Sequence, residues 1–232
     1  MRFSGCFVAI SLLFVSLLYT AHPAFPQAPD TSRPNPSRGD ALQNYRVGRD
    51  LEARNRIDEA QVYYNEAVRI CNLELSANPS NMDSYTVLTW TLQRQKKYAE
   101  VISWGERGLR VNANDYRIVE TMGEAYFYLD NFAASLRFMQ RYVNSMPQGE
   151  RASVAYFFIG EIYRLQRRFR HADIAYTTAL RLDPGSALWW YRLGTVRESA
   201  GDAAPAAEAY ERALRISPGY REAGEGLARV RG

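Results

Sequence analysis

The sequence is poor in the residues that usually carry catalysis or bind metals. Its 232 residues include only two cysteines and two histidines. No cysteine pair, histidine–carboxylate pair or cysteine–histidine cluster has the spacing of metal ligands. No glycine-rich loop is followed by a lysine in phosphate-binding order, and the Gly-x-Ser-x-Gly motif of a serine nucleophile is missing. We therefore predict no enzymatic activity, no catalytic residue, no metal site and no cofactor.

Lysine is almost absent, and the net charge is small. Lys96 and Lys97 are the two lysines, so arginine supplies nearly all of the positive charge. The 29 basic and 25 acidic residues leave a formal net charge of +4, and the two signs are interspersed along the chain. A nucleic-acid-binding domain usually carries a concentrated basic stripe. We therefore expect no nucleic-acid partner.

Residues 1–21 have the pattern of an export signal. Arg2 precedes an apolar run at 6–19, which is shorter than the ~20 residues of a membrane span. The candidate cleavage sites have bulky residues where small ones are preferred, so both a cleaved signal and an uncleaved anchor stay open. We expect export to the periplasm or cell envelope, with a possible membrane tether through residues 6–19.

Residues 22–40 form a proline-rich segment that contains five of the ten prolines and no apolar period. Proline blocks regular backbone hydrogen bonding, so we expect a solvated linker before a folded part that begins at Ala41. Once the N-terminal segment is removed or isolated, Cys71 is the remaining cysteine and no intramolecular disulfide can form. Cys71 stands among apolar residues at helical spacing, and we expect it to be buried.

From residue 41 onward the sequence repeats with a period of 34 residues. Residues 175–184 and 209–218 share six identities in ten positions. The phase continues backwards with two changes of spacing: three extra residues at 148–150 and seven extra residues within 69–81. Seven residues make about two helical turns, so a helix can lengthen by this amount without changing its face. A fixed period of this length indicates stacked, similar units.

Each unit reads as two amphipathic helices joined by a polar turn. Gly160 of a first helix and Tyr176 of a second helix recur 34 residues later as Gly194 and Tyr210. A glycine inside a helix costs ~1 kcal/mol relative to alanine, so a recurring one needs a packing reason. We expect these glycines to let the two helix backbones approach closely, with the tyrosines filling the remaining space.

These recurring residues resemble the tetratricopeptide repeat. The fifth unit shows the family pattern as Trp190, Leu193, Gly194, Ala206, Tyr210, Ala213 and Pro218. The fourth unit shows it as Tyr156, Ile159, Gly160, Tyr163, Ala172, Tyr176, Ala179 and Pro184. The earlier units match more loosely, and Tyr142 and Arg197 depart from the pattern. The resemblance implies an all-α solenoid of helix-turn-helix repeats, wound as a right-handed superhelix with a concave face.

The resemblance and the spacing together divide residues 41–232 into five repeats and a cap. The expected repeats are 41–80, 82–115, 116–152, 153–186 and 187–220, and a capping helix is expected within 221–232. A polar cap is needed because the last repeat of a stack would otherwise expose its apolar face.

Members of this family usually bind ligands on the concave face, which the first helices form. Carried onto this sequence, the inward positions are Tyr45, Arg49, Trp90, Gln93, Arg94, Glu124, Phe127, Tyr128, Phe157, Glu161, Arg164, Tyr191, Thr195 and Glu198. Aromatic residues and arginine are common in interface hot spots. We therefore predict a non-enzymatic scaffold or adaptor that holds a peptide or helix of a partner protein. The asparagine–lysine set with which some members hold a chain-terminal carboxylate is missing, so we expect no capture of a C-terminus.

A second hypothesis is an accessory subunit of a transport system whose groove binds a small apolar ligand. It requires a closed cavity lined by Phe127, Tyr128 and Phe157, whereas peptide binding requires an open track. Four arginines also crowd the turn between Arg164 and His171. We interpret them as solvated charge at a helix junction, with a patch for an acidic partner or lipid headgroups as the alternative.

Overall fold

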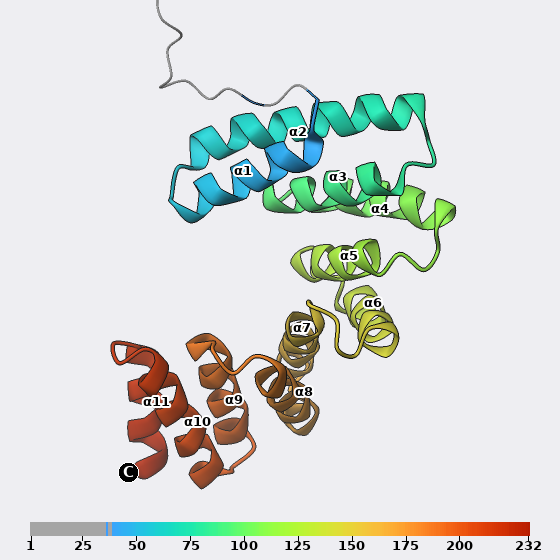
Figure 1. Ribbon diagram of the computed structural model, residues 1–232. Coiled ribbons are helices and arrows are strands. Elements are labelled where there is room, and N and C mark those ends of the chain that lie inside the picture. The colour runs from blue at the N-terminus through green and yellow to red at the C-terminus, as the bar shows by residue number, and fades with distance from the viewer. Residues whose placement is uncertain (1–35, 37–38) are drawn as a thin grey trace, which may run out of the picture. The chain divides into compact units, whose positions relative to one another are not determined.

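The computed structural model describes Pro36 and residues 39–232, which contain eleven α-helices and no strand (Figure 1). Ten helices form five consecutive pairs. The first helices of the pairs are α1 (Ala41–Ala53), α3 (Met82–Arg94), α5 (Tyr116–Tyr128), α7 (Ala152–Leu165) and α9 (Ala187–Ser199). The second helices are α2 (Ile57–Ala77), α4 (Tyr98–Val111), α6 (Phe132–Ser145), α8 (Phe169–Leu182) and α10 (Ala203–Ile216). A last helix, α11 (Arg221–Arg231), follows the fifth pair. The predicted all-α repeat fold is confirmed.

Every helix packs against the helix that follows it in the chain. In addition, α1 contacts α3, α3 contacts α5, α5 contacts α7, and α9 contacts α11. The first helices of the first four pairs therefore lie next to one another, and residues 39–232 belong to one compact unit. No pair could bury its apolar face alone, and stacking supplies the missing cover.

The predicted export signal at 1–21 and residues 22–35, 37 and 38 of the predicted linker lie outside the described residues. At the linker's end, the side chain of Asp40 caps α1 by accepting a hydrogen bond from the backbone of Gln43 at 2.7 Å. Such a cap satisfies an amide that the first turn of a helix leaves without a partner. Within residues 39–232, none of the helices combines the length and apolar character needed to cross a bilayer.

The recurring glycines make room for tyrosine rings. A Cβ atom built on Gly160 would lie 2.6 Å from the ring of Tyr176, and one on Gly194 would lie 2.6 Å from the ring of Tyr210. Both tyrosines are fully buried. The expectation that a tyrosine fills the remaining space is therefore confirmed: the aromatic ring of the second helix occupies the space that the glycine leaves.

The turn inside each pair uses the same backbone conformation. One residue per turn has a positive φ, between 56° and 84°, where side chains with a Cβ are strained. These residues are Asn55, Lys96, Asp130, Arg167 and Gly201. Since their spacing follows the repeat, the turn is a property of the fold, and only the fifth pair places a glycine there.

Both changes of spacing have structural counterparts. Helix α2 has 21 residues, whereas α4, α6, α8 and α10 have 14 each, so the predicted lengthening is confirmed. The extra residues 148–150 lie in the loop between α6 and α7. Helix α7 begins at Ala152, one residue before the expected start of the fourth repeat.

Both departures from the repeat pattern have local partners. Tyr142 is buried, and its hydroxyl accepts a hydrogen bond from the backbone of Arg151 at 3.3 Å. Arg197 pairs with Asp173 at 2.7 Å. The predicted burial of Cys71 is confirmed, and this burial raises the pKa of its thiol to about 12, which keeps it protonated and inert.

Candidate functional site

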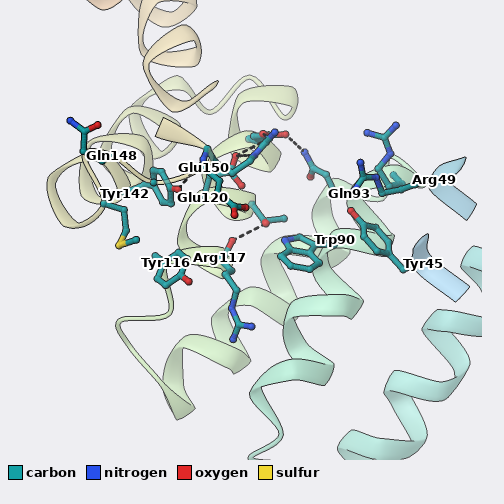
Figure 2. Close-up of a pocket in the computed structure, with 16 residues that line it drawn as sticks. Tyr45, Arg49, Trp90, Gln93, Tyr116, Arg117, Glu120, Tyr142, Gln148 and Glu150 are labelled. Carbon is teal, nitrogen blue, oxygen red and sulfur yellow. Dashed lines mark hydrogen bonds and ion pairs between the residues drawn. The ribbon is translucent and has the colours of Figure 1, made fainter. Parts of the chain in front are cut away.

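A pocket of about 770 Å³ lies where α1, α3 and α5 meet the loop between α6 and α7 (Figure 2). Figure 2 shows Tyr45 and Arg49 at one end and Tyr142 and Gln148 at the other. The three helices are first helices of successive pairs, so the wall is built from the same side of each pair. The volume falls within the range of ordinary ligand pockets.

Six of the predicted groove residues line this pocket. They are Tyr45, Arg49, Trp90, Gln93, Arg94 and Glu124. Their convergence follows from the repeat, because equivalent turns of stacked first helices face the same way. That these residues bind a partner remains a prediction.

The remaining lining residues were missed at the sequence level. Helix α5 adds Tyr116, Arg117, Glu120 and Thr121, and α6 with its following loop adds Tyr142, Met146, Gln148, Gly149, Glu150 and Arg151. The α5 residues belong to earlier turns of the helix than the predicted inward positions. The three-residue insertion at 148–150 was the available signal, because a break in an otherwise regular period marks a place where one unit differs.

Aromatic rings stand at both ends of the pocket. The ring centroids of Tyr45 and Trp90 are 5.7 Å apart, and the guanidinium of Arg49 lies 5.8 Å from the Tyr45 ring. At the loop end, the rings of Tyr116 and Tyr142 are 6.5 Å apart. Tyr116 is 44% exposed, so part of its ring is open to an incoming chain. Such rings offer a large contact area together with a polar tip.

A charge cluster of the buried Glu120, the largely buried Glu124 and the exposed Arg151 forms the wall between these ends. Arg151 pairs with Glu120 at 2.9 Å and also with Glu124, and Gln93 donates a hydrogen bond to Glu124 at 2.9 Å. Burial, followed by the nearby charge of Glu124, raises the pKa of Glu120 well above that of an ordinary glutamate, although Arg151 opposes the shift. One arginine thus holds the loop against two carboxylates of α5.

Two charged residues of the pocket have no ion-pair partner among the described residues. Arg49 and Glu150 are exposed and take part in none of the salt bridges. By contrast, Arg94 pairs with Glu52 at 2.8 Å, and Arg117 pairs with Asp115 at 2.8 Å. Unpaired charges of opposite sign in one pocket can orient a bound chain by electrostatic complementarity.

The predicted aromatic positions Phe127, Tyr128 and Phe157 lie outside this pocket and pack against other rings. The Phe127 and Phe158 rings are 5.0 Å apart, and Tyr128 stacks on Tyr98 at 4.8 Å. Phe157 stacks on Trp189 at 5.1 Å. These contacts place Phe127 and Phe157 in the packing between helix pairs, whereas Tyr128 stacks on a neighbouring pair but stays 50% exposed.

The predicted groove charges of α7 and α9 are held in internal networks. Glu161 is buried and accepts a hydrogen bond from the hydroxyl of Tyr176 at 2.5 Å. It also pairs with Arg164 at 2.8 Å and with Arg192 at 3.1 Å. The hydroxyl of Tyr176 is thereby tied to two arginines through one carboxylate.

The fifth pair has an equivalent network, in which the carboxylate belongs to a residue one helical turn later in the first helix. Glu198 accepts a hydrogen bond from Tyr210 and pairs with Arg229 of α11 at 2.8 Å. Thr195 donates to the backbone of Arg192 at 2.8 Å, and the ring of Tyr191 lies 5.1 Å from that of Tyr220. These predicted groove residues therefore bind the cap and their own helix.

The arginine-rich turn before α8 is mostly engaged. Arg170 pairs with Asp202 at 2.7 Å, and the guanidinium of Arg168 lies 4.8 Å from the Tyr163 ring. The ring of His171 lies 5.2 Å from that of Tyr163. Within residues 39–232, no three histidine, cysteine, aspartate or glutamate side chains are placed to hold a metal ion.

These features define the class of the protein: an α-helical repeat domain with a pocket on the first helices of its first three pairs. The tetratricopeptide-repeat family model matches residues 153–186 and 190–220. The fourth and fifth helix pairs therefore match the tetratricopeptide-repeat family, and the first three pairs have the same two-helix architecture. Folds of this kind typically serve as interaction scaffolds.

Several solved structures share this fold. MamA from Desulfovibrio magneticus RS-1 superposes with a TM-score of 0.62 at 17% identity, over 79% of this chain and 99% of that chain. TTC0263 from Thermus thermophilus gives 0.59 at 17% identity, over 82% and 98%. YrrB, described as a TPR protein with an unusual peptide-binding site, gives 0.57 at 20% identity, over 82% and 92%. The comparison with curated proteins finds no match.

Proposed function

We propose that this chain is an adaptor that holds a segment of a partner protein in the pocket between α1, α3, α5 and the 146–151 loop. The observation that carries the proposal is the convergence of two aromatic pairs with the unpaired Arg49 and Glu150 in one space of about 770 Å³. The peptide-binding site of YrrB, which has the same fold, supports it.

The chemistry of the pocket favours an extended segment or helix with apolar anchors and charges of both signs. Tyr45, Trp90 and Tyr116 offer ring faces for the anchors, and the two unpaired charges would fix the direction of the chain. No group of the pocket is arranged as a nucleophile with a base, so we propose binding without turnover.

We also propose that the adaptor works outside the cytoplasm, in the periplasm or cell envelope. The support is the apolar run at 6–19 after Arg2, with the proline-rich segment 22–40 as the connection to the folded part. The mass of the N-terminus of the native protein, purified from an envelope fraction, tests this. An N-terminus near residue 22 or 25 indicates a cleaved signal, a full-length mass in a membrane pellet indicates an anchor, and recovery from the cytoplasm alone would contradict export.

Site-specific photo-crosslinking tests the binding proposal. A photoreactive phenylalanine analogue replaces Tyr116, which is 44% exposed in the pocket, and in a control replaces Ile174 of α8, which is 67% exposed and outside the pocket. Irradiation in the native cell is expected to give discrete protein adducts from position 116 and none of the same mass from position 174. The same adducts from both positions, or no protein adduct from position 116, would contradict the proposal.

A further inference from the structure

A second pocket, of about 420 Å³, lies between α8, α9 and α10 and shares no lining residue with the first pocket. Its floor is apolar: Leu180, Leu193 and Ala209 line it and are almost fully buried. Trp190 forms one side, and its indole nitrogen already donates to the backbone oxygen of Pro184 at 2.9 Å. The ring therefore presents an apolar surface to the pocket.

Positive charge surrounds this apolar floor. Arg181, Arg197 and Arg212 line the pocket, and Glu208 is the one acidic residue that does so. Arg197 is engaged by Asp173 at 2.7 Å. Arg181 and Arg212 are exposed, and neither has an acidic partner within 4.0 Å among residues 39–232. The guanidinium of Arg212 lies 6.0 Å from the Trp190 ring.

An apolar floor beneath two unpaired guanidinium groups fits one class of ligand. A guanidinium binds a carboxylate, sulfonate or phosphate through paired hydrogen bonds. The floor favours a ligand that also has an apolar body, because such a body removes these side chains from water. The volume lies within the range of small-molecule sites.

We propose that the pocket between α8, α9 and α10 binds a small anionic amphiphile. The anionic group lies against Arg181 and Arg212, and the apolar body lies over Leu180, Leu193 and the Trp190 ring. The proposal is independent of the adaptor function, because it uses none of the residues of the first pocket.

Calorimetric titration of the full-length protein tests the proposal with ten-carbon probes. The probes are decanoate below its micelle concentration, neutral decan-1-ol, and the decyltrimethylammonium cation. Decanoate is expected to bind with a stoichiometry of one, at least tenfold more tightly than either of the other two. No saturable binding of decanoate, or equal binding of decan-1-ol, would overturn the proposal.

Two matched variants locate the charge effect. In the double variant Arg181→Gln/Arg212→Gln, decanoate is expected to bind at least tenfold more weakly, while decan-1-ol binds as before. In the control Arg107→Gln/Arg110→Gln, two exposed arginines of α4 are removed, and Arg107 also lies over a tryptophan, Trp104, at 4.5 Å. The control should bind decanoate as the wild type does. Equal effects of the two double variants would overturn the proposal.

Covalent labelling locates the ligand directly. A decanoate carrying a diazirine group, irradiated with the wild-type protein and mapped by mass spectrometry, is expected to label peptides of α8, α9 and α10. Excess decanoate should remove this label. Labelling confined to other helices would contradict the assignment even if decanoate binds.

Discussion

The ring of Tyr176 lies where a side chain on Gly160 would have to be, with the ring atoms Cδ1 and Cε1 each 2.6 Å from an ideal Cβ position. The tyrosine has no room to withdraw, since it is fully buried and its hydroxyl is bonded to Glu161. A helical glycine, which costs ~1 kcal/mol relative to alanine, is thus retained because the partner helix needs the space.

Substitution of Gly160 tests this contact. Gly160→Ala should lower the free energy of unfolding by about 1–3 kcal/mol, because overpacking of a rigid core outweighs the gain in helix propensity. Urea unfolding monitored by circular dichroism measures the change. The matched control is Gly224→Ala in α11, where nothing lies within 4 Å of the added methyl group, and this variant should be as stable as wild type or more stable. Equal effects of the two substitutions would refute the packing argument.

In the turns inside the helix pairs, by contrast, a substitution is expected to raise stability. Arg167 has a φ of +59°, and the left-handed conformation costs a residue with a Cβ about 1–2 kcal/mol. Arg167→Gly should therefore raise the thermal midpoint, while Arg168→Gly, at a φ of −87°, should not. A lower midpoint for Arg167→Gly would mean that its side chain contributes more than the strain it causes.

Ionised Glu198 should stabilise the folded protein, so the stability of the wild type should fall when this carboxylate is protonated. The hydrogen bond from Arg229, aided by that from Tyr210 and partly opposed by burial, lowers the pKa of Glu198. The ionised Glu198 side chain therefore stabilises the folded protein at pH values above its unfolded-state pKa of about 4.3. This stabilisation is lost as the pH falls through the lower pKa of the folded state. Thermal midpoints of wild type and Glu198→Gln should differ at pH 7 and converge below pH ~4. A difference that stays constant over this range would contradict the assignment.

The effect of Glu120 on stability should have the opposite dependence on pH from that of Glu198. Because burial and the charge of Glu124 raise its pKa, the folded protein holds this proton more tightly than the unfolded chain does. The contribution of Glu120 to the free energy of unfolding therefore declines as the pH rises from the unfolded-state pKa of about 4.3 through the raised pKa of the folded state. Glu120→Gln should be at least as stable as wild type at pH 7, with the advantage shrinking on acidification, as measured by urea unfolding at several pH values. A variant less stable at pH 7 than at pH 5, relative to wild type, would count against this account.

The repeat could be read from the sequence because its determinants are local and periodic. Gly160 and Gly194 mark the same packing contact, and the extra residues before Met82 lengthen α2 without changing its face. The pocket could be read only in part. Tyr45 and Trp90 follow from the phase of the first helices. The role of Arg151 does not, because its pairing with Glu120 depends on how a loop folds across a helix about thirty residues earlier in the chain.

The predicted groove residues of α7 and α9 do not line the pocket. The cause is again a contact between side chains of different helices. Glu161 and Glu198 stand at inward positions, yet a tyrosine from the second helix and an arginine from the next first helix reach each of them. Whether an inward charged side chain faces a ligand or a neighbouring repeat depends on which side chains of the next two helices contact it. The apolar periodicity of a single helix does not predict these contacts.

If the pocket of α1, α3, α5 and the 146–151 loop holds a partner segment, the affinity of the protein for that segment is the most direct test. The segment captured by crosslinking at position 116 is titrated by fluorescence anisotropy against wild type, Trp90→Ala and the control Trp104→Ala, whose tryptophan lies on α4 outside the pocket. We predict that Trp90→Ala weakens binding by roughly 30-fold, as expected for a hot spot of about 2 kcal/mol, and that Trp104→Ala binds as wild type. Wild-type affinity in a folded Trp90→Ala protein would contradict the proposed binding site.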